Sequence, residues 1–139
     1  MAMKRFFILL YLIISSLYVL GQEKPKHPID KWLDECLTKD ESTAGMLKCA
    51  DEAYKKWDVE LNKVYKELLG VLDTDSQKRL KESQRAWLKF RDDEFKLLES
   101  FYSKKEGTMF LPMHAFDKID IIKNRVQELN GHLQIIKDM

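Results

Sequence analysis

The residues of this chain best suited to chemistry are carboxylates. Glu60 and Glu67 lie in one helical stretch, and Asp92, Asp93 and Glu94 form a run in the next. Paired carboxylates can act as acid and base in glycoside hydrolysis. Here they lie in lysine-rich stretches with helical spacing, which is typical of a solvated helix face. We therefore expect no enzymatic activity.

Other chemical motifs point the same way. The serines lack the strand–turn–helix setting of a nucleophile elbow, and the sequence holds no glycine-rich phosphate loop. The three histidines are scattered, and none forms a ligand-spaced motif with a cysteine. They are His27, His114 and His132. We expect no cofactor and no bound metal.

Polar residues recur at helical spacing in two successive stretches of the chain. Asp58, Asn62 and Tyr65 form a stripe beside the apolar stripe that includes Trp57, Leu61, Val64 and Leu68. In the next helical stretch, Gln84 and Arg91 interrupt an apolar seam about one turn on either side of Trp87. An antiparallel hairpin turning near residues 73–74 would bring the two sets together. The predicted polar cluster is Asp58, Asn62, Tyr65, Gln84, Trp87 and Arg91.

Within this cluster we expect Asp58 to pair with Arg91 and Asn62 to hydrogen-bond near Gln84 or Trp87. Residues in such a cluster would specify the fold and would not form an active site. The alternative is a seam edge, at which the long side chains reach water.

The apolar periodicity predicts an all-α protein, a small helical bundle built on a long antiparallel helical hairpin with short flanking helices. The hairpin covers about residues 43–72 and 75–104, and the flanking helices cover 29–37 and 113–137. Thr74 and Gln77 have the spacing of a capping box for the second hairpin helix.

The first 21 residues have the pattern of a secretory signal peptide. Lys4 and Arg5 precede an uncharged run that ends at Leu20. This run is shorter than the roughly 18–20 residues needed to span a bilayer, although an uncleaved membrane anchor is the alternative. Residues 22–28 would then be a flexible leader and 29–139 a single helical domain. We expect a periplasmic or secreted protein that has no membrane span after cleavage between Gly21 and Gln22. Because cleavage there does not create an N-terminal cysteine, we also expect no lipid anchor.

Charge and cysteine content fit an exported protein. Loss of Lys4 and Arg5 from 24 basic residues, against 23 acidic ones, brings the formal net charge from +1 to −1. A nucleic-acid binder would show a basic excess, so we expect no nucleic-acid partner. The only two cysteines, Cys36 and Cys49, are expected to form a disulfide.

Residues 103–111 form the main irregular segment and are the candidate for a partner-binding loop. Two lysines, a turn glycine and three apolar residues follow one another there. The candidate contacts are Lys104, Lys105, Thr108, Met109 and Phe110. In the alternative interpretation, Met109, Phe110 and Leu111 cap the core of the bundle.

Over about residues 36–125, these elements resemble the exported domain of the lysozyme-inhibitor LprI family, which also occurs as a domain of unknown function in bacterial envelope proteins. The matching residues are Cys36 and Cys49; Asp58, Leu61, Asn62, Tyr65 and Leu68; Leu80, Gln84, Trp87, Arg91 and Asp92; Gly107 and Thr108; and Arg125. The resemblance implies a helical fold and inhibition of a lysozyme-type muramidase by binding and occlusion. The rival interpretation is a helical envelope interaction or structural module with a non-lysozyme partner.

The chain departs from the family pattern at one pair of positions. Many relatives carry a second disulfide, and here Phe95 and Asp117 take the places of its cysteines. Both cysteines are missing together, which avoids a lone thiol in an exported protein. The rigidity of the loop around Gly107 is therefore an open question at the level of sequence.

Overall fold

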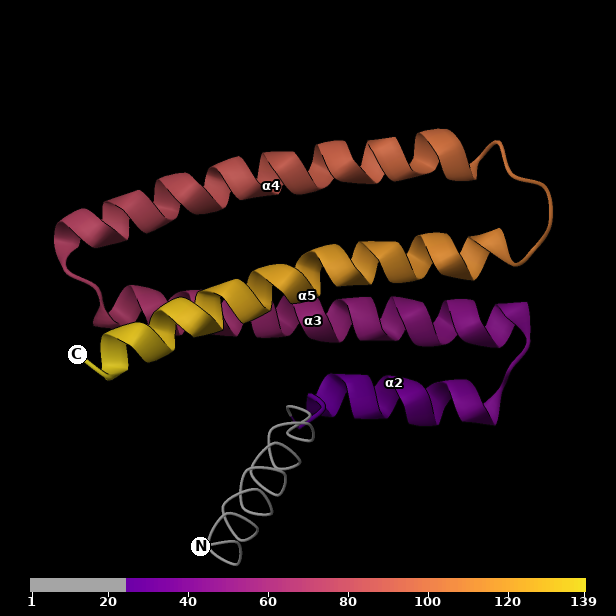
Figure 1. Ribbon diagram of the computed structural model, residues 1–139, viewed down its shortest axis with the longest axis horizontal. Coiled ribbons are helices and arrows are strands. Elements are labelled where there is room, and N and C mark those ends of the chain that lie inside the picture. The colour runs from indigo at the N-terminus through magenta and orange to yellow at the C-terminus, as the bar shows by residue number, and fades with distance from the viewer. Residues whose placement is uncertain (1–24) are drawn as a thin grey trace, which may run out of the picture.

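The computed structural model describes residues 25–139, so the predicted signal peptide lies outside the described residues. Within this range, four helices follow one another (Figure 1). They are α2 (Pro28–Lys39), α3 (Thr43–Val71), α4 (Thr74–Tyr102) and α5 (Phe110–Lys137). The described residues contain no strand, which confirms the predicted all-α class. Within the same range, no helix is long and apolar enough to cross a membrane.

The core lies between α3 and α5, which pack along each other over much of their length (Figure 1). The predicted stripe of α3 is buried, and Trp57 is 0% exposed. A stripe on α5 covers it with residues at steps of three and four, as amphipathic helices require. The buried α5 residues of the core are Ile119, Ile122, Val126, Leu129 and Leu133. Burial of each such side chain stabilises the fold by about 1.5–3 kcal/mol.

The helix α4 runs back antiparallel to α3 (Figure 1), but it is far less buried than its neighbours. Leu80 is its only buried residue. Its backbone approaches that of α5 and stays apart from that of α3. The two helices of the predicted hairpin are therefore joined by a tight turn but are held together mainly through α5.

The last helix differs from the prediction. At 28 residues α5 is nearly as long as α3 and α4, so it is a principal helix and not a short flanking one. As the predicted range 113–137 required, it continues through Asn130 and Gly131, and Leu133, beyond them, is buried at 2% exposure against the core. The 12-residue α2 is the one short helix of the described chain.

The turn between α3 and α4 is capped in a different way from the predicted capping box. Asp73 is the N-cap of α4, and its Oδ1 accepts hydrogen bonds from the backbone N–H groups of Asp75 and Ser76, both at 3.0 Å. Gln77 instead reaches backwards and donates from Nε2 to the carbonyl oxygens of Leu69 and Leu72 at the end of α3. Side chains thus satisfy two of the free backbone groups at each helix end within the turn.

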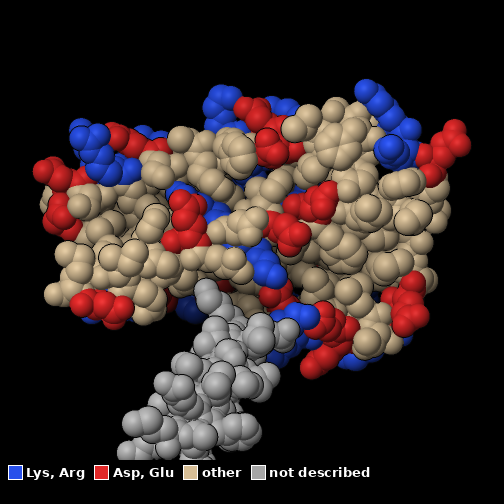
Figure 2. All heavy atoms as spheres, in the orientation of Figure 1, with Lys and Arg blue, Asp and Glu red and all other residues tan. Residues whose placement is uncertain are grey.

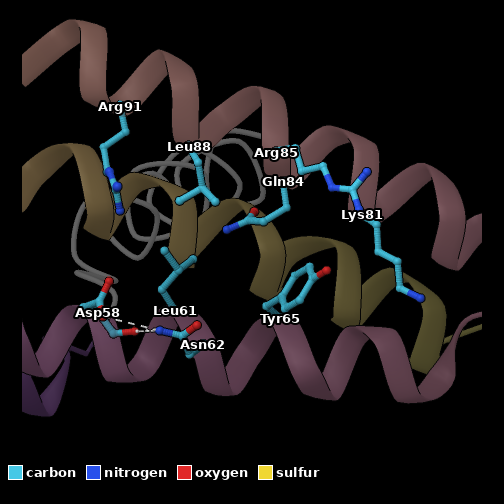
Figure 3. A pocket seen from close by; sticks show the side chains of 9 residues that line it. All are labelled: Asp58, Leu61, Asn62, Tyr65, Lys81, Gln84, Arg85, Leu88 and Arg91. Atoms are coloured by element: carbon cyan, nitrogen blue, oxygen red, sulfur yellow. Dashed lines mark hydrogen bonds between the residues drawn. The ribbon is translucent and has the colours of Figure 1, made fainter.

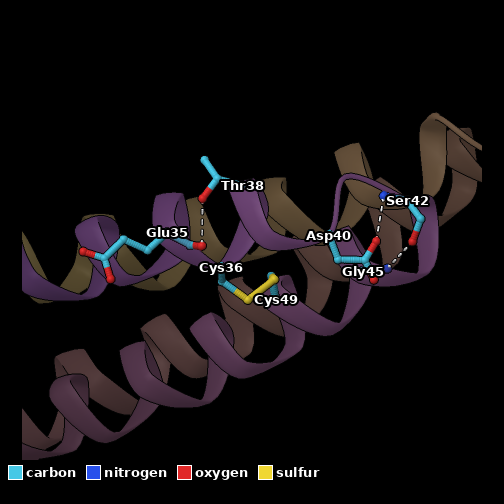
Figure 4. The surroundings of a disulfide bond; sticks show 7 residues. All are labelled: Glu35, Cys36, Thr38, Asp40, Ser42, Gly45 and Cys49. Carbon is cyan, nitrogen blue, oxygen red and sulfur yellow. Dashed lines mark hydrogen bonds between the residues drawn. A yellow bond between two sulfur atoms is a disulfide. The ribbon is translucent and has the colours of Figure 1, made fainter.

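The disulfide predicted from sequence is present and attaches α2 to the start of α3 (Figure 4). The Cα atoms of Cys36 and Cys49 are 5.8 Å apart. No residue of α2 is fully buried, but Ile29, Trp32 and Leu33 pack against the core beside this covalent link. A second link joins α2 to α5, where Lys123 pairs with Asp30 at 2.8 Å.

Gly45 allows the α2–α3 turn to close. Its backbone N–H donates to Oγ of Ser42, the N-cap of α3, at 3.0 Å (Figure 4). A Cβ atom at this position would lie 2.3 Å from Cγ of Asp40 and 2.5 Å from its carbonyl oxygen. A larger residue would therefore push the turn away from the helix.

Candidate functional site

Polar residues of α3 and α4 line a cleft of about 380 Å³ between the two helices (Figure 3). The lining residues are Asp58, Leu61, Asn62, Tyr65, Lys81, Gln84, Arg85, Leu88 and Arg91. The structure thus brings five of the six residues of the predicted polar cluster to one place. Trp87 does not line the cleft.

The pairing expected across this cleft is not formed. Arg91 donates from Nε and Nη2 to Oδ1 of its neighbour Asp92, at 3.0 and 2.7 Å. Asn62 donates from Nδ2 to the carbonyl oxygen of Asp58 at 2.8 Å and more weakly to its Oδ2 at 3.4 Å. Because the backbones of α3 and α4 stay apart, each side chain finds a partner on its own helix.

Gln84 has a partner that sequence reasoning missed, the buried Arg125 of α5. Arg125 is 5% exposed and donates from Nε to Oε1 of Gln84 at 3.1 Å. Its Nη2 donates to Oγ of Ser83 at 3.2 Å, and its Nη1 pairs with Glu128 at 2.8 Å. The sequence does contain one indication of this contact, because Arg125 lies between Ile122 and Val126, which belong to an apolar stripe.

Trp87 belongs to the same contact between α4 and α5. The guanidinium carbon of Arg125 lies 5.8 Å from the centroid of the Trp87 ring, and that of Arg91 lies at the same distance. Cations at this range are attracted to the ring face. Gln84, Trp87 and Arg125 therefore join α4 to α5 and have a structural role.

The connection between α4 and α5 lies at one end of the bundle (Figure 1) and exposes apolar side chains. Met109 is 63% exposed, and Leu111, in the first turn of α5, is 52% exposed, so these two residues do not cap the core as the alternative interpretation held. Lys104 and Lys105 are exposed beside them, and Phe110 is half-buried. Gly107 turns the chain with φ at 102°, a conformation that favours glycine.

A hydrogen bond closes the base of this loop. The hydroxyl of Tyr102, at the end of α4, donates to Oδ2 of Asp117 on α5 at 2.6 Å. This bond raises the pKa of Tyr102 above its usual value. The Tyr102 ring also stacks on His114, with centroids 5.2 Å apart. Burial lowers the pKa of His114, and the neighbouring Lys118 lowers it further.

Phe95 and Asp117, at the two places where the family resemblance suggests a second disulfide, instead make non-covalent contacts. Asp117 accepts the bond from Tyr102, and Phe95 packs 6.2 Å from the ring of Tyr54 on α3. The ammonium of Lys118 on α5 lies 5.4 Å from the centroid of the Phe95 ring. The α4–α5 connection is therefore held at its base without a second disulfide.

Charged side chains of both signs are interspersed over the face of the molecule in Figure 2, without a broad field of one sign. Among residues 25–139, no group of three or more histidine, cysteine, aspartate or glutamate side chains is placed to hold a metal ion.

These features define a small, disulfide-linked, all-α domain. Residues 34–129 match the sequence profile of the family described as "Lysozyme inhibitor LprI". Because this match covers more than half of the chain, the protein belongs to the LprI family. No curated protein matches its sequence.

The fold is also similar to that of a solved protein. A crystal structure of an uncharacterized protein from Burkholderia thailandensis is 32% identical in sequence and superposes with a TM-score of 0.75. The match covers 81% of this chain but only 56% of that protein. The chain therefore spans a little over half the length of this relative.

Proposed function

We propose that this protein is an exported, periplasmic or secreted inhibitor that blocks a lysozyme-type muramidase by occluding its cleft. Membership of the LprI family supports inhibition of lysozyme. The observation that carries the choice of surface is the exposure of Met109 and Leu111 next to Lys104 and Lys105. Apolar side chains exposed together at a protruding end are typical of protein-binding surfaces.

The chemistry of the target fits this loop. The active cleft of a lysozyme carries two carboxylates that flank the scissile bond. An ammonium group from Lys104 or Lys105 can pair with them, while Met109 and Leu111 bury apolar surface in the cleft. The hydrogen bond from Tyr102 to Asp117 limits the freedom of the loop, and this lowers the entropic cost of binding. Inhibition of this kind needs no catalytic group.

The test is an inhibition assay with the exported protein purified from a bacterial host. Lysis of cell-wall suspensions by lysozymes of different structural types is followed with and without the protein. We expect inhibition of at least one type, and we expect the quadruple variant Lys104→Ala, Lys105→Ala, Met109→Ser, Leu111→Ser to lose it. These side chains are exposed, so the variant should remain folded by circular dichroism.

A matched control removes comparable groups elsewhere. Val59 is 68% exposed on α3, and Lys66 is exposed on the same helix. The variant Val59→Ser, Lys66→Ala should inhibit as the parent protein does. Absence of inhibition of every lysozyme at micromolar excess would contradict the proposed function. Inhibition that survives in the loop variant would contradict the proposed surface.

One observation favours the second candidate function, a helical interaction module with another envelope protein. Phe90, Leu97 and Phe101 occupy one side of α4 and are 53%, 53% and 41% exposed. Such a row can pack against a partner helix. If lysozymes are not inhibited, serine substitutions in this row that abolish a cross-link to an envelope protein in cells would support this function.

A further inference from the structure

We propose that the cleft between α3 and α4 binds a short acidic peptide of four or five residues. This site is separate from the α4–α5 loop, and the proposal does not depend on inhibition of lysozyme. It concerns the polar cleft of Figure 3, whose lining residues have no pairing across it.

Two of the three cations on the α4 side of the cleft, Lys81 and Arg85, are unpaired within the described chain, whereas the third, Arg91, pairs with Asp92. Within residues 25–139, Lys81 and Arg85 make no ion pair and no side-chain hydrogen bond. Of the four cations of α4 that lie outside the cleft, three have a carboxylate partner on that helix and Lys78 has none among the described residues. These pairs are Arg79–Glu82, Lys89–Asp93 and Lys96–Asp93. Among the described residues, the only carboxylate that lines the cleft, Asp58, lies at its other end, so two cations without a partner favour an anionic ligand at this end.

Neutral donors in the cleft favour the same ligand. The side-chain oxygen of Gln84 accepts from Arg125, and Figure 3 shows the nitrogen of its amide directed into the cleft. The hydroxyl of Tyr65, on the opposite wall, has no hydrogen-bond partner within the described chain. A carboxylate placed between these groups would accept from the amide, the phenol and the two cations together.

The cleft is not cationic along its whole length, and this selects a peptide over a uniform polyanion. Asp58 lies near Arg91 at the other end of the cleft from Lys81 (Figure 3). Its carboxylate would repel a second phosphate of a nucleic acid but can accept the backbone N–H of a peptide. Leu61 and Leu88, between the two ends, offer apolar contact to a side chain.

The dimensions give the length of the ligand. Lys81 and Arg91 are ten residues apart on one helix, or about 15 Å at a rise of 1.5 Å per residue. An extended peptide covers this distance with four or five residues at about 3.3 Å each.

The experiment uses nuclear magnetic resonance titration of the exported protein, with acetyl-tetraglutamate amide as the probe and acetyl-tetraglutamine amide as its uncharged counterpart. We expect saturable shifts, confined to backbone amides near residues 58–65 and 81–91, with the glutamate peptide only. Shifts spread over the whole surface, or equal shifts with the glutamine peptide, would overturn the proposal.

Two double variants distinguish binding at this cleft from general attraction between charges. Lys81→Gln, Arg85→Gln should weaken binding by about tenfold or more. Arg79→Gln, Lys89→Gln removes the same charge from the same helix outside the cleft and should change affinity by less than about twofold, as screened surface charges do. Equal losses in the two variants would overturn the proposal. So would displacement of the peptide by inorganic phosphate at equal concentration, which would indicate a simple anion site.

Discussion

Tyr102 at the end of α4 and Asp117 on α5 are joined by a hydrogen bond of 2.6 Å that closes the base of the α4–α5 loop. We expect Tyr102→Phe to release the loop while leaving the helices in place. Hydrogen exchange of the backbone amides of residues 103–109 should become faster. Tyr65→Phe removes a phenol that has no hydrogen-bond partner within the described chain and should leave exchange in the loop unchanged. Unchanged exchange in Tyr102→Phe would show that other contacts hold the loop.

The buried Arg125 should contribute more to stability than the half-buried Arg91. Arg125→Ala leaves the side chains of Gln84 and Ser83 without their partner, and hydrogen bonds to charged groups are worth about 1.5–3 kcal/mol. We expect a loss of about 2–4 kcal/mol in the free energy of unfolding by urea. Arg91→Ala removes a pairing with the exposed Asp92 and should cost about 1 kcal/mol or less. The reverse order would contradict the assignment of Arg125 as the main polar link to α4.

Removal of the disulfide should detach α2. The double variant Cys36→Ser, Cys49→Ser opens a loop of about 14 residues, for which chain entropy gives roughly 3 kcal/mol. Thermal unfolding followed by circular dichroism should show this loss. Because Trp32 of α2 packs against the core and would lose this contact, the tryptophan fluorescence of the protein should shift towards that of a solvated indole. A variant as stable as the parent would show that packing alone holds α2.

Glycine is required at Gly45 and not at Gly131. Alanine at Gly45 would force Asp40 and its backbone out of the turn, at a cost of about 1–3 kcal/mol in unfolding free energy. Nothing lies within 4 Å of a Cβ atom built at Gly131. Since that residue lies within α5, Gly131→Ala should stabilise the protein by about 0.5–1 kcal/mol. Urea titrations of the two variants should therefore move in opposite directions.

His114 should make the stability of the protein depend on pH. Its pKa is lowered in the folded state, chiefly by burial and then by Lys118, while Glu99 and Asp117 oppose this shift. A lowered pKa means that folding favours the neutral imidazole. This contribution is complete above the unfolded pKa of about 6.5 and is lost as pH falls through the folded pKa.

The measurement is the unfolding free energy in urea at pH 7.5 and at pH 5. His114→Gln should lose less stability between the two values than the parent protein does. The exposed His132 serves as the control, and His132→Gln should retain the dependence of the parent. If the unfolding free energy of all three proteins changed equally with pH, the change would come from groups other than His114.

Helical periodicity predicted the elements and the buried faces of this protein well, but not which faces meet. The three–four steps through Trp57 and Leu68 identify a buried stripe because burial of that kind leaves a local pattern. The pattern does not say which helix covers the stripe, and here α5 covers it. For that reason the ion pair expected between Asp58 and Arg91, which assumed close packing of α3 on α4, is not formed.

The candidate sites also show that spacing predicts which residues share a face of one helix, but not which residues meet across helices. Spacing on each helix was enough to gather Asp58, Asn62 and Tyr65 on one wall of the cleft. The partner of Gln84 lies 41 residues further along, and no local pattern connects Gln84 to Arg125. Likewise, an apolar run in a loop has the same spacing whether it is exposed or covers a core. Only the structure shows that Met109 and Leu111 are exposed.

The single buried residue of α4 has a consequence for the order in which the molecule opens. Cooperative units with few apolar contacts unfold at a lower free energy than the molecule as a whole. The amides in the middle of α4 should therefore exchange through a partial opening in which α3, α5 and the disulfide-linked α2 remain native. We therefore expect α4 to move relative to the packed pair of α3 and α5. Because α4 forms one wall of the cleft, this movement would change the distance between the two walls.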